Sequence, residues 1–109
     1  MHSEILIIET TTAKKEQAES IVNTLLNKKL IACANISEVF SIYNWGNEAQ
    51  REAEYKISCK TLEEKEEICL KEIKELHPYR VPMILATIKD CNQEYQEWVK
   101  EKVEWIYLK

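Results

Sequence analysis

Glycine is nearly absent from this chain of 109 residues, which holds one glycine, two prolines and four cysteines. One glycine leaves no glycine-rich loop to build an oxyanion hole. Acidic residues outnumber basic ones, and the net charge of −4 argues against a nucleic-acid surface, which needs a basic stripe. No apolar run approaches the roughly 20 residues of a membrane span. No pair of cysteines has the Cys-x-x-Cys spacing of many metal and redox sites.

The length and composition predict a single globular domain. A chain of this size buries roughly 60–70% of its unfolded surface, which is enough for one core without disulfides or metal. We expect Cys33, Cys59, Cys69 and Cys91 to be reduced and mostly buried, as in a cytoplasmic protein. The first residues hold no basic segment followed by a hydrophobic run, so we expect no secretory signal.

The first half of the chain predicts a strand, a helix and a long hairpin. The β-branched run over 5–8 indicates a buried strand, and Thr11 or Thr12 offers the N-cap of a helix. The inner stripe of that helix is Ala18, Ile21, Val22, Leu25 and Leu26, and Lys28 and Lys29 close it. Residues 32–45 predict a long strand with a bend or bulge near Ser37 and Glu38. Gly46 marks the hairpin turn, and the return strand alternates cleanly over 53–59.

The second half predicts helix, strand and helix. Thr61 and Glu64 have the spacing of a capping box, followed by a helical stripe of Leu62, Cys69, Ile73 and Leu76. Residues 83–88 predict another strand, and Asn92 caps a third helix with the stripe Tyr95, Trp98 and Val99. The apolar tail over 105–108 is expected to dock on the protein. The order β-α-β-β-α-β-α predicts an α+β protein, a ferredoxin-like βαββαβ sandwich with an antiparallel sheet plus a C-terminal helix.

The aromatic residues of the hairpin predict a homo-oligomer. Strand faces that carry Tyr43, Trp45 and Tyr55 are too apolar to lie bare in water, and a long strand edge invites pairing with another chain. We therefore expect these residues, together with Trp98, to pack within or between subunits.

The connector His77-Pro78-Tyr79-Arg80-Val81-Pro82 is the first place to look for a chemical site. Its prolines end the preceding helix and hold an imidazole, a phenol and a guanidinium in nearly fixed positions. The sequence leaves two roles open for His77: a metal ligand, or a ring that satisfies a nearby carbonyl or carboxylate. Tyr79 and Arg80 are expected to line a cleft between subunits or to make structural hydrogen bonds.

Four motifs in order resemble the CutA family of divalent-cation tolerance proteins: Ala32-Cys33-Ala34-Asn35-Ile36, Ser41-Ile42-Tyr43-Asn44-Trp45, His77-Pro78-Tyr79-Arg80-Val81-Pro82 and Tyr95-Gln96-Glu97-Trp98. The resemblance runs from about residue 5 to residue 99. It implies a ferredoxin-like fold, a homotrimer similar to the PII signalling proteins, a link to copper and other divalent cations, and no enzymatic activity.

The resemblance also implies candidate metal ligands. His77 corresponds to a position proposed as a metal ligand in some bacterial members of the family, and Cys33 matches the Ala-Cys motif, where it offers a thiolate. Where those members have a second histidine, this chain has Leu76, and where they have a thiol after the first strand it has a threonine near Thr10.

Other functions of the same fold lack their motifs here. The predicted third strand has no RNA-binding aromatic run, the first loop has no copper-chaperone Cys-x-x-Cys, and no arginine precedes the first helix as an acylphosphatase requires. A hydrolase built on Cys33 and His77 would lack an oxyanion loop. Two hypotheses remain: a metal-binding trimer with its site near His77, and a PII-like scaffold whose clefts bind a small anion or a partner protein through Arg80 and the face of Lys56 and Lys60.

Overall fold

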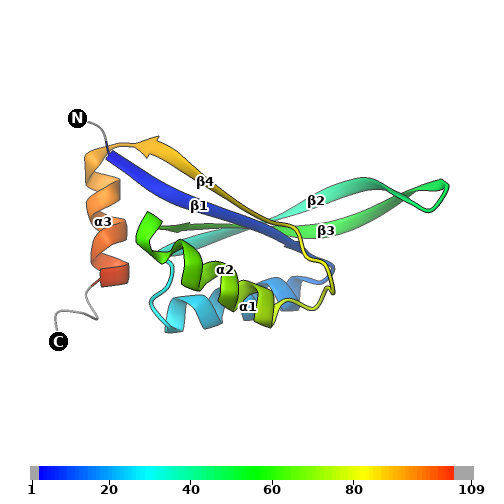
Figure 1. Cartoon of the computed structure of the whole chain (residues 1–109), viewed down its shortest axis with the longest axis horizontal. Helices are drawn as coiled ribbons and strands as arrows, with labels where there is room; N and C mark the ends of the chain where they lie inside the picture. The colour runs from blue at the N-terminus through cyan, green and yellow to red at the C-terminus, as the bar shows by residue number, and fades with distance from the viewer. Residues whose placement is uncertain (1–2, 105–109) are drawn as a thin grey trace.

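Four strands form one antiparallel sheet in the computed structural model, which describes residues 3–104 (Figure 1). The sheet order is β2-β3-β1-β4, from β1 (Ser3–Thr12), β2 (Cys33–Trp45), β3 (Glu48–Thr61) and β4 (Ile84–Cys91). The helices are α1 (Lys15–Asn27), α2 (Glu66–Leu76) and α3 (Gln93–Glu104), with a 3-10 turn, η1 (Glu63–Lys65), before α2. The predicted ferredoxin-like architecture with an added C-terminal helix is confirmed. The apolar tail over 105–108 lies outside the described residues.

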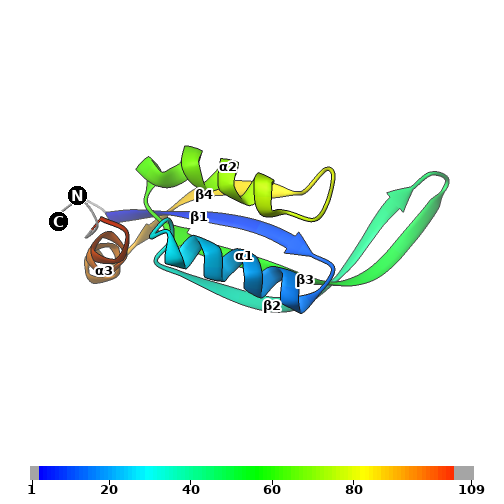
Figure 2. The same ribbon diagram turned by 90° about the horizontal axis from the view of Figure 1, so that it is seen from below.

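The main core lies between the sheet and the pair α1 and α2, which run side by side over one sheet face (Figure 2). The predicted stripe of α1 is confirmed, since Ala18, Ile21, Val22 and Leu25 are buried in this core with Cys69 and Ile73 of α2. A smaller cluster lies by α3 and consists of Ile5, Leu62, Val99 and Val103. Each face of β1 therefore packs against a helix, which explains why its apolar residues do not alternate with polar ones.

The ends of α1 differ from the sequence prediction in one respect. Neither Thr11 nor Thr12 is the N-cap, because β1 continues through Thr12 and the helix begins at Lys15. The Lys14 N–H donates to the side-chain oxygen of Gln17 at 3.2 Å, and this contact closes the first turn instead. At the other end Lys29 has a φ of 60°, and its N–H donates to the Leu26 carbonyl.

Two further local predictions were wrong. β2 and β3 pair without interruption from Cys33↔Lys60 to Trp45↔Glu48, so there is no bulge near Ser37. Thr61 is the last residue of β3 and does not cap a helix. Its buried hydroxyl donates to the Leu30 carbonyl at 2.7 Å, and α2 begins only at Glu66, after η1 and two residues beyond the predicted capping box.

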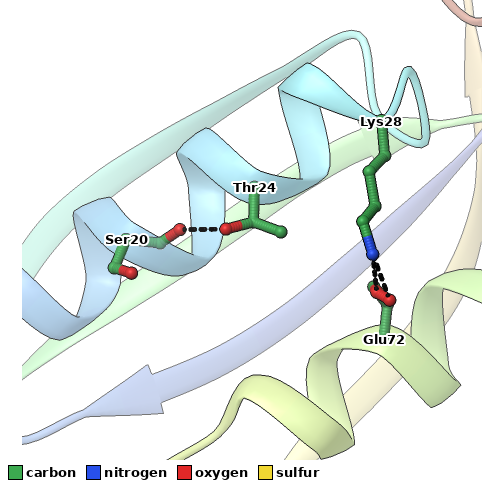
Figure 3. A network of polar contacts seen from close by, with 4 residues as sticks. All are labelled: Ser20, Thr24, Lys28 and Glu72. Atoms are coloured by element: carbon green, nitrogen blue, oxygen red, sulfur yellow. Dashed lines mark hydrogen bonds and ion pairs between the residues drawn. The ribbon is translucent and has the colours of Figure 1, made fainter.

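A polar contact joins α1 to α2 on the outer surface (Figure 3). The Lys28 ammonium lies 2.8 and 2.9 Å from the two carboxylate oxygens of Glu72, and the Thr24 hydroxyl donates to the Ser20 carbonyl one turn earlier in α1. Because the lysine side chain is more than half exposed, solvent screens the pair, and such surface pairs contribute between zero and about 1 kcal/mol. The two helices are held chiefly by the core beneath them.

The β2–β3 hairpin extends beyond the rest of the sheet as an arm formed by residues 39–54 (Figure 1). β3 pairs with β1 only from Tyr55 to Thr61, so beyond Tyr55 its one neighbour is β2. The molecule measures 51 × 29 × 21 Å, and its radius of gyration of 15.1 Å exceeds the roughly 13 Å of a compact chain this long. Several large apolar side chains on the arm are exposed: Phe40, Ile42, Tyr43 and Trp45. Within residues 3–104, no helix has the length and apolar character to cross a membrane.

Candidate functional site

The connector between α2 and β4 lies at the base of the arm, as its two prolines predict. α2 ends at Leu76, and His77 has extended backbone angles (φ −73°, ψ 134°), which the following proline favours. The chain then turns through residues 78–83 and enters β4 at Ile84. The predicted end of the helix at Leu76 is confirmed.

The imidazole of His77 is buried, and both of its nitrogens have partners within the chain. Nδ1 accepts a hydrogen bond from the Tyr79 N–H at 3.1 Å, so the proton of a neutral ring lies on Nε2. Nε2 lies 2.8 Å from the carbonyl oxygen of Thr11, to which it donates. Burial lowers the pKa of His77, although the bond to Thr11 and the charge of Glu54 oppose that shift. The ring is therefore neutral at pH 7 and ties the connector to the end of β1.

Two tyrosine–glutamate pairs extend from this histidine along the arm. The ring of Tyr79 lies 5.0 Å from that of His77, and its hydroxyl donates to Glu54 at 2.7 Å. The hydroxyl of Tyr43 donates to Glu52 in the same way. Burial and the Glu54 carboxylate raise the pKa of Tyr79, and the hydrogen bond to Glu52 raises the pKa of Tyr43. Both phenols remain protonated donors, and each is within the field of both carboxylates.

A groove of about 820 Å³ lies where the arm meets the connector. Tyr79 and Arg80 both line this groove within a single chain, and their predicted place in a cleft between subunits stays a prediction. Its remaining lining residues come from the end of β1, the two strands of the arm and the approach to β4: Thr11, Ala13, Ser41, Tyr43, Trp45, Glu52, Glu54, Val81 and Met83. The strand register places the arm residues of this set on the sheet face opposite α1 and α2.

The structure does not bring Cys33 close to His77. Cys33 pairs with Lys60, which pairs with Ile7, whereas His77 contacts Thr11. These positions on β1 are four residue steps apart, about 14 Å along the strand. The thiol of Cys33 lies 3.3 Å from the Tyr95 hydroxyl of α3. The nucleophile–base pair considered for a hydrolase is therefore not assembled within one chain.

The four residues predicted at a subunit interface lie in three different environments. Tyr43 and Trp45 line the groove, and Trp45 is 72% exposed. Tyr55 packs against the main core, and its hydroxyl donates to Glu38 at 3.1 Å on the helix-covered face. Trp98 is partly exposed on α3, where it stacks on Tyr95 with ring centroids 5.7 Å apart.

The residues present fit a divalent cation only in part. In the part of the chain that the structure describes, no three histidine, cysteine, aspartate or glutamate side chains gather to form a metal centre. At the base of the arm one chain offers a neutral imidazole and the carboxylate of Glu54, fewer than the three or four protein ligands of a typical transition-metal site. A metal on His77 would also have to replace the hydrogen bond to Thr11 or the one to Tyr79.

Sequence reasoning treated Glu52 and Glu54 as a solvated strand face and did not include them in the site. The signal was present in the hairpin itself. Counting back from Gly46 pairs Ser41 with Glu52, and strand alternation then places Tyr43 on the same face. The bond between His77 and Thr11 joins residues 66 positions apart, and no local pattern indicates it.

The fold and the connector define a ferredoxin-like protein with a protruding β-arm, and comparison with known proteins gives its family. The model of the CutA1 divalent ion tolerance protein family matches residues 6–102, so the chain belongs to that family. The divalent-cation tolerance protein CutA of Pyrococcus horikoshii is 39% identical over 101 residues, covering 92% of this chain and 99% of the relative.

Solved structures of the family agree with this assignment. The divalent ion tolerance protein CutA1 from Ehrlichia chaffeensis superposes with a TM-score of 0.88 at 35% identity, covering 94% of this chain and 97% of that one. The protein from Archaeoglobus fulgidus, named a periplasmic divalent cation tolerance protein CutA, gives a TM-score of 0.86 at 35% identity, with 92% and 99% covered. The resemblance read from the four sequence motifs is confirmed.

Proposed function

We propose that this chain is a non-enzymatic, PII-like homotrimer that acts in divalent-cation tolerance by binding Cu²⁺ or another divalent cation at His77. Membership of the CutA1 family supports the link to divalent cations. The observation that carries the choice of site is the neutral imidazole of His77 within the field of the Glu54 carboxylate, which itself lines the groove at the base of the arm. Cys33, offered as a second ligand by the family motif, is too distant in the same chain to share that ion.

The chemistry of His77 suits a borderline metal such as copper. A neutral imidazole is the form that ligates, and burial keeps this ring neutral at pH 7. Binding requires one of the two ring hydrogen bonds to break. Loss of the Thr11 contact would free the connector from the end of β1, so metal binding at this site is coupled to the position of the connector and of the groove wall.

The exposed apolar side chains of the arm support the proposal of a homotrimer. A two-stranded ribbon is marginally stable by itself in water, yet this one exposes Phe40, Ile42 and Trp45 without cover from the rest of the chain. A second copy that packs on the helix-side face of the arm would bury Phe40 and Ile42, and Trp98 of α3 offers a further exposed aromatic surface. Cyclic assembly of three copies places every arm in an equivalent contact.

The proposed compartment is the cytoplasm. Cys33, Cys59, Cys69 and Cys91 are all unpaired thiols, which are typical of a reducing environment. Burial raises the pKa of Cys59 and of Cys69 to about 12, so these two are protonated and unreactive at neutral pH.

Isothermal titration of the reduced oligomer with Cu²⁺ and Zn²⁺ tests the metal site. His77→Ala is compared with His2→Ala, which removes the other histidine of the chain, and with Cys33→Ser. We expect binding in the wild type, His2→Ala and Cys33→Ser proteins, and its loss in His77→Ala at unchanged mass. Identical isotherms for His77→Ala and the wild type would contradict the proposal.

A further inference from the structure

The groove between the arm and the connector has a chemistry that divalent-cation tolerance does not explain. Most of its lining is apolar or aromatic, whereas a metal site requires converging polar ligands. Its volume of about 820 Å³ lies within the range of pockets that hold small organic molecules. The lining of the groove therefore points to an organic ligand.

The charged side chains that line the groove favour one sign of charge on that ligand. Glu52 and Glu54 contribute two carboxylates to the lining, against the single guanidinium of Arg80. One oxygen of each carboxylate accepts a tyrosine hydroxyl, which fixes the orientation of the carboxylate without neutralising it. Both carboxylates act on the Tyr43 and Tyr79 hydroxyls together, so they form one negative centre. This balance disfavours the small anion considered from the sequence and favours a cation.

The aromatic side chains select the kind of cation. Tyr43, Trp45 and Tyr79 come from three separate segments and meet around the same groove, with Val81 and Met83 adding apolar surface. The face of an aromatic ring attracts a cation that has shed its water, and an alkylated ammonium sheds water far more readily than Mg²⁺ or Zn²⁺. Aromatic rings beside oriented carboxylates form a surface complementary to an ammonium group attached to an apolar body.

We propose that the groove lined by Tyr43, Trp45, Glu52, Glu54 and Tyr79 is a binding site for organic ammonium ions. This goes beyond the proposed function, because it concerns a different class of ligand. It requires neither a metal ion at His77 nor a given number of subunits. The ammonium group lies against the two carboxylates, and the apolar part of the ligand lies against Trp45 and the connector.

The test uses three small benzene derivatives of different charge on the full-length oligomer. Benzyltrimethylammonium is the cation, benzyl alcohol the neutral compound and benzenesulfonate the anion, with binding followed by NMR of the tryptophan indole N–H signals. We expect the cation to bind more tightly than either of the other probes. Equal binding of all three, or tighter binding of the anion, would overturn the proposal.

Variants then locate the site. Glu52→Gln removes one carboxylate, and Glu38→Gln is its matched control, since Glu38 also accepts a tyrosine hydroxyl but lies on the opposite sheet face. We expect Glu52→Gln to weaken benzyltrimethylammonium binding about fivefold and Glu38→Gln to leave it unchanged. Trp45→Ala should weaken it about two- to fivefold. Unchanged binding in Glu52→Gln would overturn the proposal.

Two added measurements separate this proposal from the metal site. Light scattering of each variant shows whether the oligomer is intact, and a Cu²⁺ titration of Glu52→Gln shows whether the His77 site is retained. Ammonium binding that survives His77→Ala but falls in Glu52→Gln supports the groove site even if the metal proposal fails. Ammonium binding that falls equally in Glu38→Gln and Glu52→Gln would reflect general surface charge and would overturn it.

Discussion

Replacing Phe40 by serine tests whether the arm is buried between subunits. Phe40 is 64% exposed in the single chain and lies on the arm, on the sheet face that carries the helices but beyond their cover. Full burial of a phenylalanine side chain contributes about 1.5–3 kcal/mol. Covering the exposed two-thirds therefore stabilises the assembly by about 1–2 kcal/mol for each copy, or about 3–6 kcal/mol for three equivalent copies.

This magnitude should be visible as dissociation on dilution. Since each 1.4 kcal/mol changes an equilibrium constant tenfold, Phe40→Ser should raise the trimer dissociation constant by roughly two to four orders of magnitude. Light scattering over a dilution series measures the mass against the 12.9 kDa of one chain. The folding of the monomer should change little, because the side chain is already largely in water.

The matched control is Ile68→Ser, which removes a side chain that is 51% exposed on α2, away from the arm. We expect this variant to keep the wild-type mass at every concentration. Superimposable dilution curves for Phe40→Ser, Ile68→Ser and the wild type would refute the argument that the arm is covered in the assembly. A wild-type protein with the mass of one chain at micromolar concentration would refute the trimer itself.

Three further predictions concern pH, thiols and the core. Because burial lowers the pKa of His77 in the folded protein, the unfolded chain binds a proton at His77 at a higher pH than the folded chain does. Thermal stability should therefore fall as the pH drops below about 6.5, and His77→Gln should lack this part of the pH dependence. A wild-type and a variant profile of equal slope would contradict this. Iodoacetamide at pH 8 should leave Cys59 and Cys69 unlabelled until urea unfolds the protein, as mass spectrometry can establish. Ile57→Ala, at a fully buried position, should lower the free energy of unfolding by about 2–5 kcal/mol in chemical denaturation, and a loss below 1 kcal/mol would contradict its place in the core.

The element order could be predicted because the strongest local patterns agree with the tertiary structure. The stripe on α1 repeats with helical spacing, and its side chains pack in the core against the sheet, with Leu26 at the margin. Gly46 has a φ of 65°, which a glycine adopts without strain, and the hairpin turns there. Pro78 ends α2 at the predicted place, since the residue before a proline disfavours helical angles.

The errors lie where tertiary contacts override a local signal. Thr12 has the chemistry of an N-cap, but it pairs with Tyr55 and remains in β1. Thr61 and Glu64 have capping-box spacing, but the Thr61 hydroxyl donates its hydrogen bond to the Leu30 carbonyl, which comes from a different part of the chain. The irregular apolar pattern near Ser37 reflects the point where the helices stop covering β2, and the backbone register continues through it.

The site was predictable in its connector and not in its surroundings. The prolines indicated that His77, Tyr79 and Arg80 would be held close together, and Tyr79 and Arg80 do line one groove. The partners of this connector come from β1 and β3, and sheet register rather than local sequence decides which residues those are. The hydrogen bond from the His77 ring to the Thr11 carbonyl joins segments far apart in the sequence, so the partner of this ring could not be predicted.

Electron paramagnetic resonance of the Cu²⁺-loaded oligomer tests most directly whether His77 is the metal ligand. We expect a nitrogen coupling from one imidazole in the wild-type and His2→Ala proteins, and its absence in His77→Ala of equal mass. The same nitrogen signal in His77→Ala, or its loss in His2→Ala, would contradict the assignment and move the cation away from the connector.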